Sequence, residues 1–178
     1  MLAVQHNTIY GSRLIATQPF RKGQLLHTFT DYRVVERPSY QTIQIALTQH
    51  IDNIGNLAYI NHSCHPNTVI DTEALTVRAA RDIAMGDELT FFYPSTEWVM
   101  DRPFICLCGA PQCIRLVAGA KYLTVETLGR YFINRHIREA IMQFLANAAT
   151  IPEETSGKAG EAALPPTITQ AQVSKQTL

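Results

Sequence analysis

The sequence carries no excess charge of either sign, because its 178 residues include fifteen lysines and arginines against fifteen aspartates and glutamates. Proteins that hold nucleic acid or an anionic membrane surface usually show a surplus of basic residues. The overall charge therefore predicts neither a nucleic acid partner nor a membrane partner.

Long apolar runs are absent as well. No segment reaches the eighteen or so apolar residues of a membrane-spanning helix. The N-terminal residues 1–7 also lack the basic region and apolar stretch that mark a secretion signal. We therefore expect an intracellular soluble protein, cytoplasmic or nuclear.

Cysteine is scarce, and its placement is uneven: the four residues are Cys64, Cys106, Cys108 and Cys113. Two disulfides are one interpretation, but a Cys-x-Cys pair bridges itself poorly and no secretion signal supports export. Four thiolates are a complete tetrahedral ligand set for a structural zinc ion. We expect all four cysteines to bind Zn²⁺.

The sequence shows neither internal repeats nor a second domain, and its length and 46% hydrophobic content suit one globular core. Beyond Thr150 the composition changes, because prolines and small polar residues dominate and aromatic residues are missing. Such a composition buries too little apolar surface to fold. We expect a disordered tail over residues 151–178.

The first half of the chain is typical of β-structure. Short apolar or β-prone runs alternate with turn residues, and they predict strands at residues 8–10, 14–17, 25–29, 42–47, 68–71, 74–79 and 89–93. No helical crossover of sufficient length lies between residues 8 and 93, so the sheets should be small and mostly antiparallel.

Residues 124–148 change to a helical pattern, because apolar side chains recur there at steps of three and four. Thr124 is a suitable N-cap. The apolar stripe predicts one C-terminal helix packed on the domain or on a second copy of the chain. Its members are Leu128, Phe132, Ile133, Ile137, Ile141, Phe144 and Leu145.

The densest chemistry lies in Asn61-His62-Ser63-Cys64-His65-Pro66-Asn67. Alone, this stretch is equally compatible with a set of turn-forming residues. It is followed in order by Glu88-Leu89-Thr90-Phe91-Phe92-Tyr93 and by a Cys-x-Cys-x4-Cys pattern at 106–113. This ordered set resembles the SET-domain family of S-adenosylmethionine-dependent protein lysine methyltransferases, and the resemblance covers roughly residues 5–122.

The resemblance implies the architecture and the domain boundaries. Residues 1–122 would form a mostly β SET fold of small antiparallel sheets with a knot-like crossing, a rare feature in proteins. This domain includes a post-SET zinc motif at residues 106–113. Residues 123–150 would form a C-terminal helical extension.

The resemblance also implies the site residues. Tyr93 would supply the catalytic hydroxyl, and Asn61 and His62 would contact S-adenosylmethionine. In the family, the position of Cys64 and the three post-SET positions share one zinc beside the active site. Further cofactor-binding candidates are Leu107, between two zinc ligands, Gly11 and Arg13, in the turn that matches the family's glycine turn, and Tyr93 itself.

Three features depart from the family pattern. Arg13 replaces the second glycine of the family's Gly-x-Gly turn, so it either narrows the cofactor pocket or turns outward. Phe92 stands where histone-modifying members often carry an acidic residue. The insert before the central motif, residues 48–59, is short, which weakens the case for a defined histone-tail groove.

The leading hypothesis is methyl transfer from S-adenosylmethionine to the amine of a protein lysine. The first alternative keeps the fold for small-molecule chemistry, either methylation or a cyclase-like or isomerase-like step. The second alternative is an inactive binding module. The partner is accordingly a protein lysine or a small molecule, with no nucleic acid and no membrane.

Overall fold

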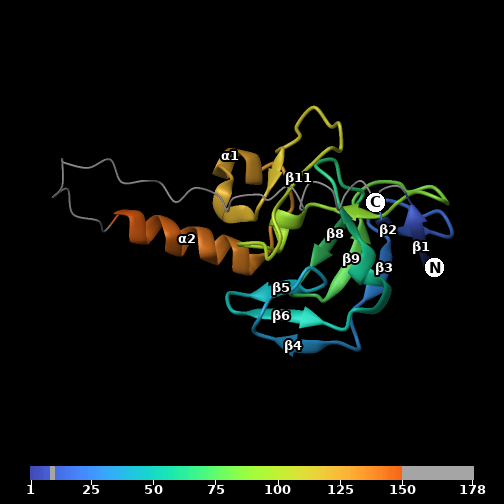
Figure 1. Cartoon of the computed structure of the whole chain (residues 1–178), viewed down its shortest axis with the longest axis horizontal. Helices are drawn as coiled ribbons and strands as arrows, with labels where there is room; N and C mark the ends of the chain where they lie inside the picture. The colour runs from blue at the N-terminus through green and yellow to red at the C-terminus, as the bar shows by residue number, and fades with distance from the viewer. Residues whose placement is uncertain (9–10, 150–178) are drawn as a thin grey trace.

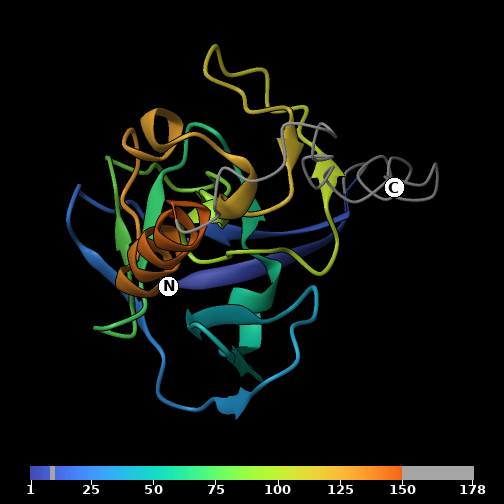
Figure 2. The same cartoon turned by 90° about the vertical axis from the view of Figure 1, so that its left-hand side faces the viewer.

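The computed structural model describes residues 1–8 and 11–149. The expected disordered tail at 151–178 lies outside the described residues. Figure 1 shows a body of small β-sheets from which one long helix, α2 (Arg135–Ala149), extends. In Figure 2 the helix points toward the viewer and stands over the middle of the sheets. Within the described part, no helix combines the length and apolar character needed to cross a membrane.

Among the described residues, four of the five sheets are antiparallel, as expected. A two-stranded sheet joins β1 (Leu2–Thr8) to β2 (Gly11–Ala16). Another joins β11 (Phe104–Ile105) to β12 (Leu116–Val117). The two three-stranded sheets have the orders β3-β9-β8 and β4-β6-β5. Their strands are β3 (Leu25–Thr28), β9 (Thr76–Ala79), β8 (Thr68–Asp71), β4 (Arg33–Val35), β6 (Gln49–Asp52) and β5 (Ile43–Ala46).

One two-residue sheet is parallel, and it brings two sequence motifs together. Thr90 and Phe91 of β10 (Thr90–Phe91) pair with β7 (Asn61–His62). The connection between these strands is the β8–β9 hairpin rather than a helix. Asn67 strengthens the junction, because its side chain donates to the Glu88 carbonyl at 2.8 Å and accepts from the Thr90 N–H at 2.8 Å.

The strand predictions for the first half of the chain were incomplete, both at the N-terminus and between residues 33 and 52. The first strand begins at Leu2 rather than Thr8, because Leu2 and Val4 pack against the main core. The strand β4 lies in a segment where no strand was predicted, and β6 lies in the expected insert 48–59. Their sequences are short and partly polar, so local propensity does not explain these strands. They form because β6 pairs with both β4 and β5 and buries Ile51.

The expected C-terminal helix is present as α2, but it begins at Arg135 rather than near residue 124. Thr124 does cap a helix, since its hydroxyl accepts from the Thr127 N–H at 3.1 Å, but that helix is the short α1 (Val125–Leu128). A second helix, α2, starts only after Asn134, which is 2% exposed and binds the backbone of Thr72, Ile70 and Ser95. These long-range hydrogen bonds fix Asn134 outside a helix and break the pattern in two.

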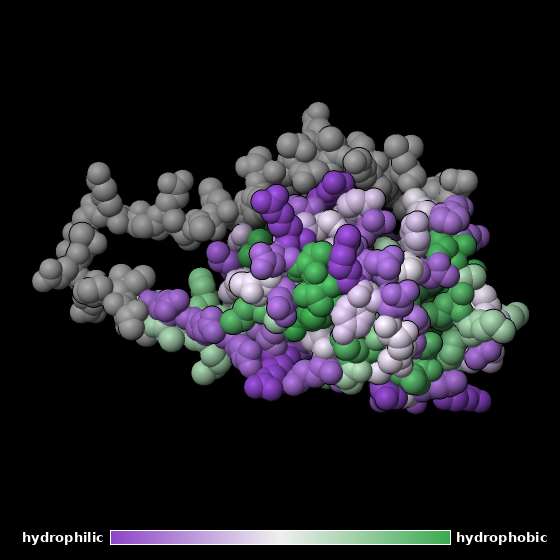
Figure 3. Space-filling view, turned by 90° about the horizontal axis from the view of Figure 1, so that it is seen from below, coloured by the Kyte–Doolittle hydropathy of each residue, from purple (hydrophilic) through white to green (hydrophobic). Residues whose placement is uncertain are grey.

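The described residues form three apolar cores, of which the smallest contains Cys64, Cys106 and Val117. The main core contains Leu14, Ile51, Ile70 and Leu89, and the second one joins Phe92 to residues of α1 and α2. Three 3-10 turns complete the fold: η1 (Gly55–Tyr59), η2 (Tyr93–Ser95) and η3 (Ala120–Tyr122). Figure 3, which views the side of the β4-β6-β5 sheet, shows apolar surface divided into separate patches by polar residues.

Candidate active site and metal centre

Tyr93 lies where β10 ends and η2 begins, beside the end of η1. Its hydroxyl donates a hydrogen bond to the carbonyl of Ile60 at 2.9 Å. Burial raises the pKa of Tyr93 well above its ordinary value, and the negative charges of Glu97 and Glu88 raise it further. The phenol therefore stays protonated at neutral pH, so it acts through hydrogen bonding and not as a base.

His62 connects Tyr93 to the cysteines. The Nδ1 atom accepts a hydrogen bond from the Tyr93 backbone N–H at 3.2 Å, and Nε2 lies 3.3 Å from the Cys64 Sγ. Because a backbone N–H can only donate, the neutral ring must carry its proton on Nε2 and direct it at the sulfur. Burial lowers the pKa of His62 to about 3, so the ring remains neutral.

The four cysteines converge as the sequence predicted. Their sulfur atoms all lie within 4.8 Å of one another, and the Sγ atoms of Cys64 and Cys106 are 3.9 Å apart. Zn–S bonds of about 2.3 Å in a tetrahedron place the sulfurs about 3.8 Å apart. All four are free thiols, which favours metal binding over two disulfides.

The surroundings of the cluster also suit a cation. The Cys64 thiol and burial raise the pKa of Cys106 above its ordinary value, so the thiolate needs a compensating positive charge. The Ile114 backbone N–H points at the Cys64 sulfur at 3.5 Å. Tyr131 and Gln112 each donate to the Cys64 carbonyl at 2.9 Å and so fix its backbone. The four-cysteine cluster fits a structural zinc ion.

Asn61 lies at the centre of the proposed cofactor-binding region. Its Nδ2 donates to the Ser12 carbonyl at 3.2 Å and to the Glu88 carboxylate at 2.7 Å, which ties β2 to β7. Gly11, at the start of β2, has a φ of 89°, a backbone conformation that favours glycine. Asn61, His62 and Gly11 therefore belong to one connected region.

Arg13 lies along the strand pair. Its Nε donates to the Gln5 side chain at 2.8 Å across β1 and β2, and its guanidinium is 3.9 Å from the Glu88 carboxylate. The Arg13 guanidinium is thus directed at the side chains of Gln5 and Glu88. Because Glu88 also holds Asn61, Arg13 still lies beside the proposed cofactor region.

Leu107 lies between two cysteines, with its side chain 70% exposed. Contact of Leu107 with a cofactor stays a prediction. Phe104 lies closer, with its ring centroid 6.0 Å from that of Tyr93 and 5.9 Å from that of His62. Phe92 turns the other way and stacks on Tyr131 at 3.6 Å, so it supports the helical extension.

A narrow cavity of about 60 Å³ lies against Tyr93. Its lining comes from the start of β5 and the residues before it, from η1 and its flanks, and from the end of β10 and the residues after it. It includes Ile43, Leu57, Ile60, Phe91, Tyr93 and Glu97. At its mouth the Arg102 guanidinium lies over the ring of Tyr40, 4.7 Å from the centroid. The cavity has room for the end of a side chain rather than for a large group.

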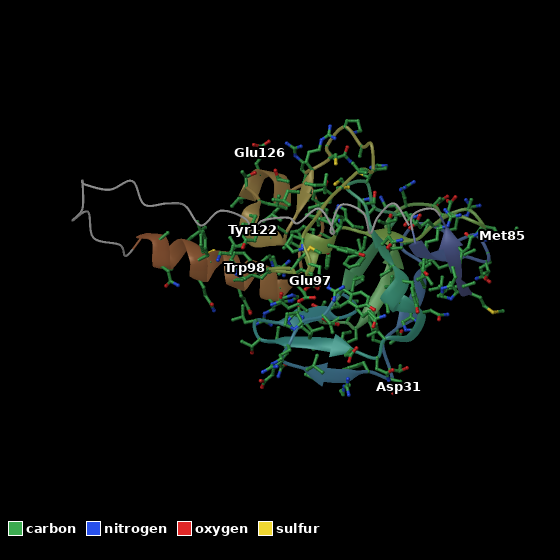
Figure 4. All side chains as sticks on the ribbon, in the orientation of Figure 1. Asp31, Met85, Glu97, Trp98, Tyr122 and Glu126 are labelled. Carbon is green, nitrogen blue, oxygen red and sulfur yellow. The ribbon has the colours of Figure 1, made fainter. Side chains whose placement is uncertain are left out.

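Sequence reasoning missed Glu97, which is only 9% exposed. Its Oε1 accepts from the Gln44 backbone N–H at 2.9 Å and from the Thr96 hydroxyl at 3.1 Å. Burial raises the pKa of Glu97 to about 7. Figure 4 shows it at the centre of the molecule, between β5 and the start of α2. The sequence signal that could have identified Glu97 is that it is the single charged residue in the segment 89–100.

Comparisons with known proteins agree with this geometry. The SET domain family matches residues 11–94. The methyltransferase flvH of Aspergillus flavus is 38% identical over 121 residues, which are 67% of this chain and 68% of flvH. An H3 lysine-4 specific histone-lysine N-methyltransferase of Schizosaccharomyces pombe is 46% identical over 66 residues, 33% of this chain but 7% of that protein. The chain thus spans two thirds of flvH and a small part of the histone enzyme.

A solved structure gives the same fold. The structure of KRYPTONITE in complex with mCHG DNA and SAH has a TM-score of 0.50 and 22% identity, over 65% of this chain and 28% of that chain. The small sheets, the tyrosine at the end of the cavity and the adjoining thiol cluster define a SET-type transferase. The chain belongs to the SET-domain family of methyltransferases. The family and fold class expected from the three motifs are confirmed.

Proposed function

We propose that this chain transfers a methyl group from S-adenosylmethionine to the side-chain amine of a protein lysine. The observation that carries the proposal is the 2.9 Å hydrogen bond from the Tyr93 hydroxyl to the Ile60 carbonyl at the inner wall of the narrow cavity. The lysine would enter through the cavity, and the cofactor would bind on the side of Gly11, Arg13, Asn61, His62 and Leu107.

The chemistry needs alignment more than covalent help. S-adenosylmethionine, when bound, supplies a methyl group on a positively charged sulfur. The amine nitrogen attacks the methyl carbon as the carbon–sulfur bond breaks, and an aligned approach can lower the barrier by about 7–11 kcal/mol. The Tyr93 hydroxyl and the Ile60 carbonyl orient the amine, while the apolar walls at Leu57 and Phe91 exclude water.

Zinc has a structural role in this proposal. Cys64, Cys106, Cys108 and Cys113 would hold it, with no position left open for substrate. The cluster would fix the segment around Phe104 against His62 and Tyr93. Thiolates available for metal are also in keeping with a reducing, intracellular compartment.

A small-molecule amine is the second candidate substrate. The relative flvH, two thirds of which the chain spans, is called a methyltransferase without mention of a histone, whereas the Schizosaccharomyces pombe enzyme matches this chain over 66 residues. The segment 48–59, which holds β6 and η1, also offers little surface for a peptide. These observations favour a substrate that needs no extended groove.

The test is transfer of labelled methyl from S-adenosylmethionine into two pools, total protein and small-molecule extract of the source cells. Label in protein lysine supports the leading proposal, and label only in small molecules supports the second. Calorimetry with S-adenosylmethionine runs in parallel. Cofactor binding without label in either pool would contradict both proposals, and loss of binding would point to an inactive module.

A further inference from the structure

The carboxylate of Glu97 is the only acidic side chain buried in the wall of the cavity among the residues that the structure describes. It comes from the same short segment as Tyr93, and the Glu97 N–H donates to the Tyr93 carbonyl at 3.0 Å. Its charge is close enough to raise the pKa of the Tyr93 hydroxyl. Glu97 and Tyr93 therefore both line the proposed substrate cavity.

The two carboxylate oxygens have different surroundings. Oε1 is fixed by the Gln44 N–H and the Thr96 hydroxyl. Within the described part of the chain, Oε2 accepts no hydrogen bond, and its closest basic atom is the His50 Nδ1 at 4.0 Å. The side chain keeps 11% of its surface accessible and lines the cavity. One oxygen is thus fixed by hydrogen bonds, and the other has no such partner within the described residues.

The neighbouring groups do not neutralise this oxygen. Burial and the nearby His136 lower the pKa of His50, so its ring is neutral at pH 7. His136 itself is directed at the Thr96 carbonyl, at 2.8 Å, and its own pKa is lowered by burial. Arg102 and Asp101 pair with each other at the exposed mouth, with 3.5 Å between their closest charged atoms. A buried carboxylate without a positively charged partner favours a cationic ligand.

We propose that Glu97 binds the substrate amine in its ammonium form and takes up the proton that it must lose before methyl transfer. The inference rests on the proposed function, since it concerns the same cavity. A proton moves from the ammonium nitrogen to the free oxygen of Glu97, which leaves a neutral amine with a lone pair. That lone pair forms the new bond to the methyl carbon, and the carbon–sulfur electrons stay on sulfur.

The pKa of Glu97, raised to about 7, suits such an exchange. A general base works best when its pKa lies near the working pH, because it is then both ionised and able to hold a proton. Tyr93 is unsuited to this role, since its own pKa is raised by burial. Among the described residues that line the cavity, Glu97 alone combines burial with a titration near neutrality.

The variant Glu97→Gln tests the charge without removing the structural bond. Its amide oxygen still accepts from the Gln44 N–H, and its NH₂ group faces the His50 Nδ1, a buried atom without a hydrogen-bond partner. The variant should therefore fold. Glu126→Gln is the matched control, because it removes the same charge from an exposed side chain on α1.

Binding of n-butylamine, a mimic of the lysine side chain, is measured by calorimetry at pH 6 and pH 8. The wild type and Glu126→Gln should bind about tenfold more tightly at pH 8, because a group with a pKa near 7 changes from mostly protonated to mostly ionised. Glu97→Gln should bind at least tenfold more weakly at pH 8 and show no such change. Equal binding by all three proteins, or no binding by the wild type, would overturn the inference.

Methyl transfer is then followed against pH with the pool that accepts label. Glu97→Gln should be slower by about 100-fold at pH 7.5, which is typical for loss of a general base, and should recover as the pH approaches the pKa of the amine itself. Unchanged rates would overturn the inference while the proposed function stands. Amine binding that depends on Glu97 without any transfer would instead leave the ammonium-binding role of Glu97 standing and contradict both the proton uptake and the proposed function.

Discussion

The Nδ1 atom of His62 accepts a hydrogen bond from the backbone N–H of Tyr93 at 3.2 Å, while its other ring nitrogen faces the Cys64 sulfur at 3.3 Å. One imidazole thus spans the proposed catalytic residue and the metal cluster. The tautomer follows from this arrangement, because the backbone N–H leaves Nδ1 only as an acceptor. Metal binding and the position of Tyr93 are therefore expected to depend on each other.

The variant His62→Phe should affect both sites at once. The Tyr93 N–H would lose its partner, and a buried donor without a partner costs about 1–3 kcal/mol. Loss of the outer contact to a zinc ligand typically weakens metal binding about 10- to 100-fold. Competition with a zinc chelator and denaturant unfolding measure the two effects. Tight zinc binding together with wild-type stability would contradict the bridging role.

Replacing Tyr93 by Phe removes the hydroxyl and leaves the ring contacts in place. The Ile60 carbonyl loses its donor, and the amine loses one of its two orienting groups. Loss of a positioned donor of this kind usually slows turnover by about 100- to 1,000-fold. Affinity for S-adenosylmethionine, measured by calorimetry, should change by only a few fold. A variant with wild-type turnover would remove Tyr93 from the mechanism.

The variant Cys108→Ser tests the metal centre at its most exposed ligand. Elemental analysis should give about one zinc per chain for the wild type and a clear loss for the variant. The midpoint of thermal unfolding should also fall, because a structural zinc contributes free energy of folding. Leu107→Ala, next to the same ligand, is the control and should keep its zinc. Unchanged metal content in Cys108→Ser would rule out a four-thiolate site.

Asn134→Ala should destabilise the junction between the sheets and α2. The Asn134 side chain accepts from the Thr72 N–H at 2.9 Å and donates to the Ile70 and Ser95 carbonyls at 2.9 Å each. The variant removes the acceptor of the buried Thr72 N–H and one donor from each of the Ile70 and Ser95 carbonyls, although the backbone N–H of residue 134 still donates to the Ser95 carbonyl at 3.1 Å. Each buried group left without a partner costs about 1–3 kcal/mol. Denaturant unfolding should show a loss of several kcal/mol. Gln143→Ala, on the exposed side of α2, should leave the unfolding free energy unchanged.

The buried carboxyl of Glu97 should also affect stability as the pH changes. Its pKa in the folded protein, about 7, lies above the ordinary value of 4.5. Between these values the folded state holds a proton that the unfolded state has lost, so the contribution of Glu97 to the unfolding free energy falls as the pH rises from about 4.5 to 7. In Glu97→Gln this fall is absent.

Denaturant unfolding at pH 5 and pH 8 measures the effect as the difference between the two proteins. This difference should change by as much as about 3 kcal/mol, since each pKa unit corresponds to about 1.4 kcal/mol. The histidines with lowered pKa, which include His50 and His136, are present in both proteins. Parallel pH profiles for the two proteins would show that the Glu97 pKa is not raised.

The parts of the site that were predictable from the sequence are those carried by contiguous motifs. Asn61, His62 and Cys64 lie within four residues of one another, so the short parallel pairing of β7 with β10 suffices to bring them beside Tyr93. The cysteines were predictable because four thiols match the ligand number of one zinc ion. In both cases the chemistry restricts the spacing.

Glu97 and the break before α2 were not predictable in the same way. Glu97 becomes part of the cavity because the backbone of Gln44, from a distant strand, holds its carboxylate. Asn134 interrupts the helical pattern only because its side chain forms hydrogen bonds with the backbone of Thr72, Ile70 and Ser95. A local pattern of apolar residues contains no information on such long-range partners, so tertiary contacts override it.

The parallel pair of β7 and β10 consists of two residues from each strand. A few hydrogen bonds, worth about 1 kcal/mol each, cannot offset the entropy lost when the long loop between His62 and Thr90 closes. The pair can persist only when the β8–β9 hairpin and the core around it are already formed. Since Tyr93 is positioned by that pair, a catalytically competent molecule must be folded throughout its sheets. Specific activity would then measure the folded fraction of a preparation.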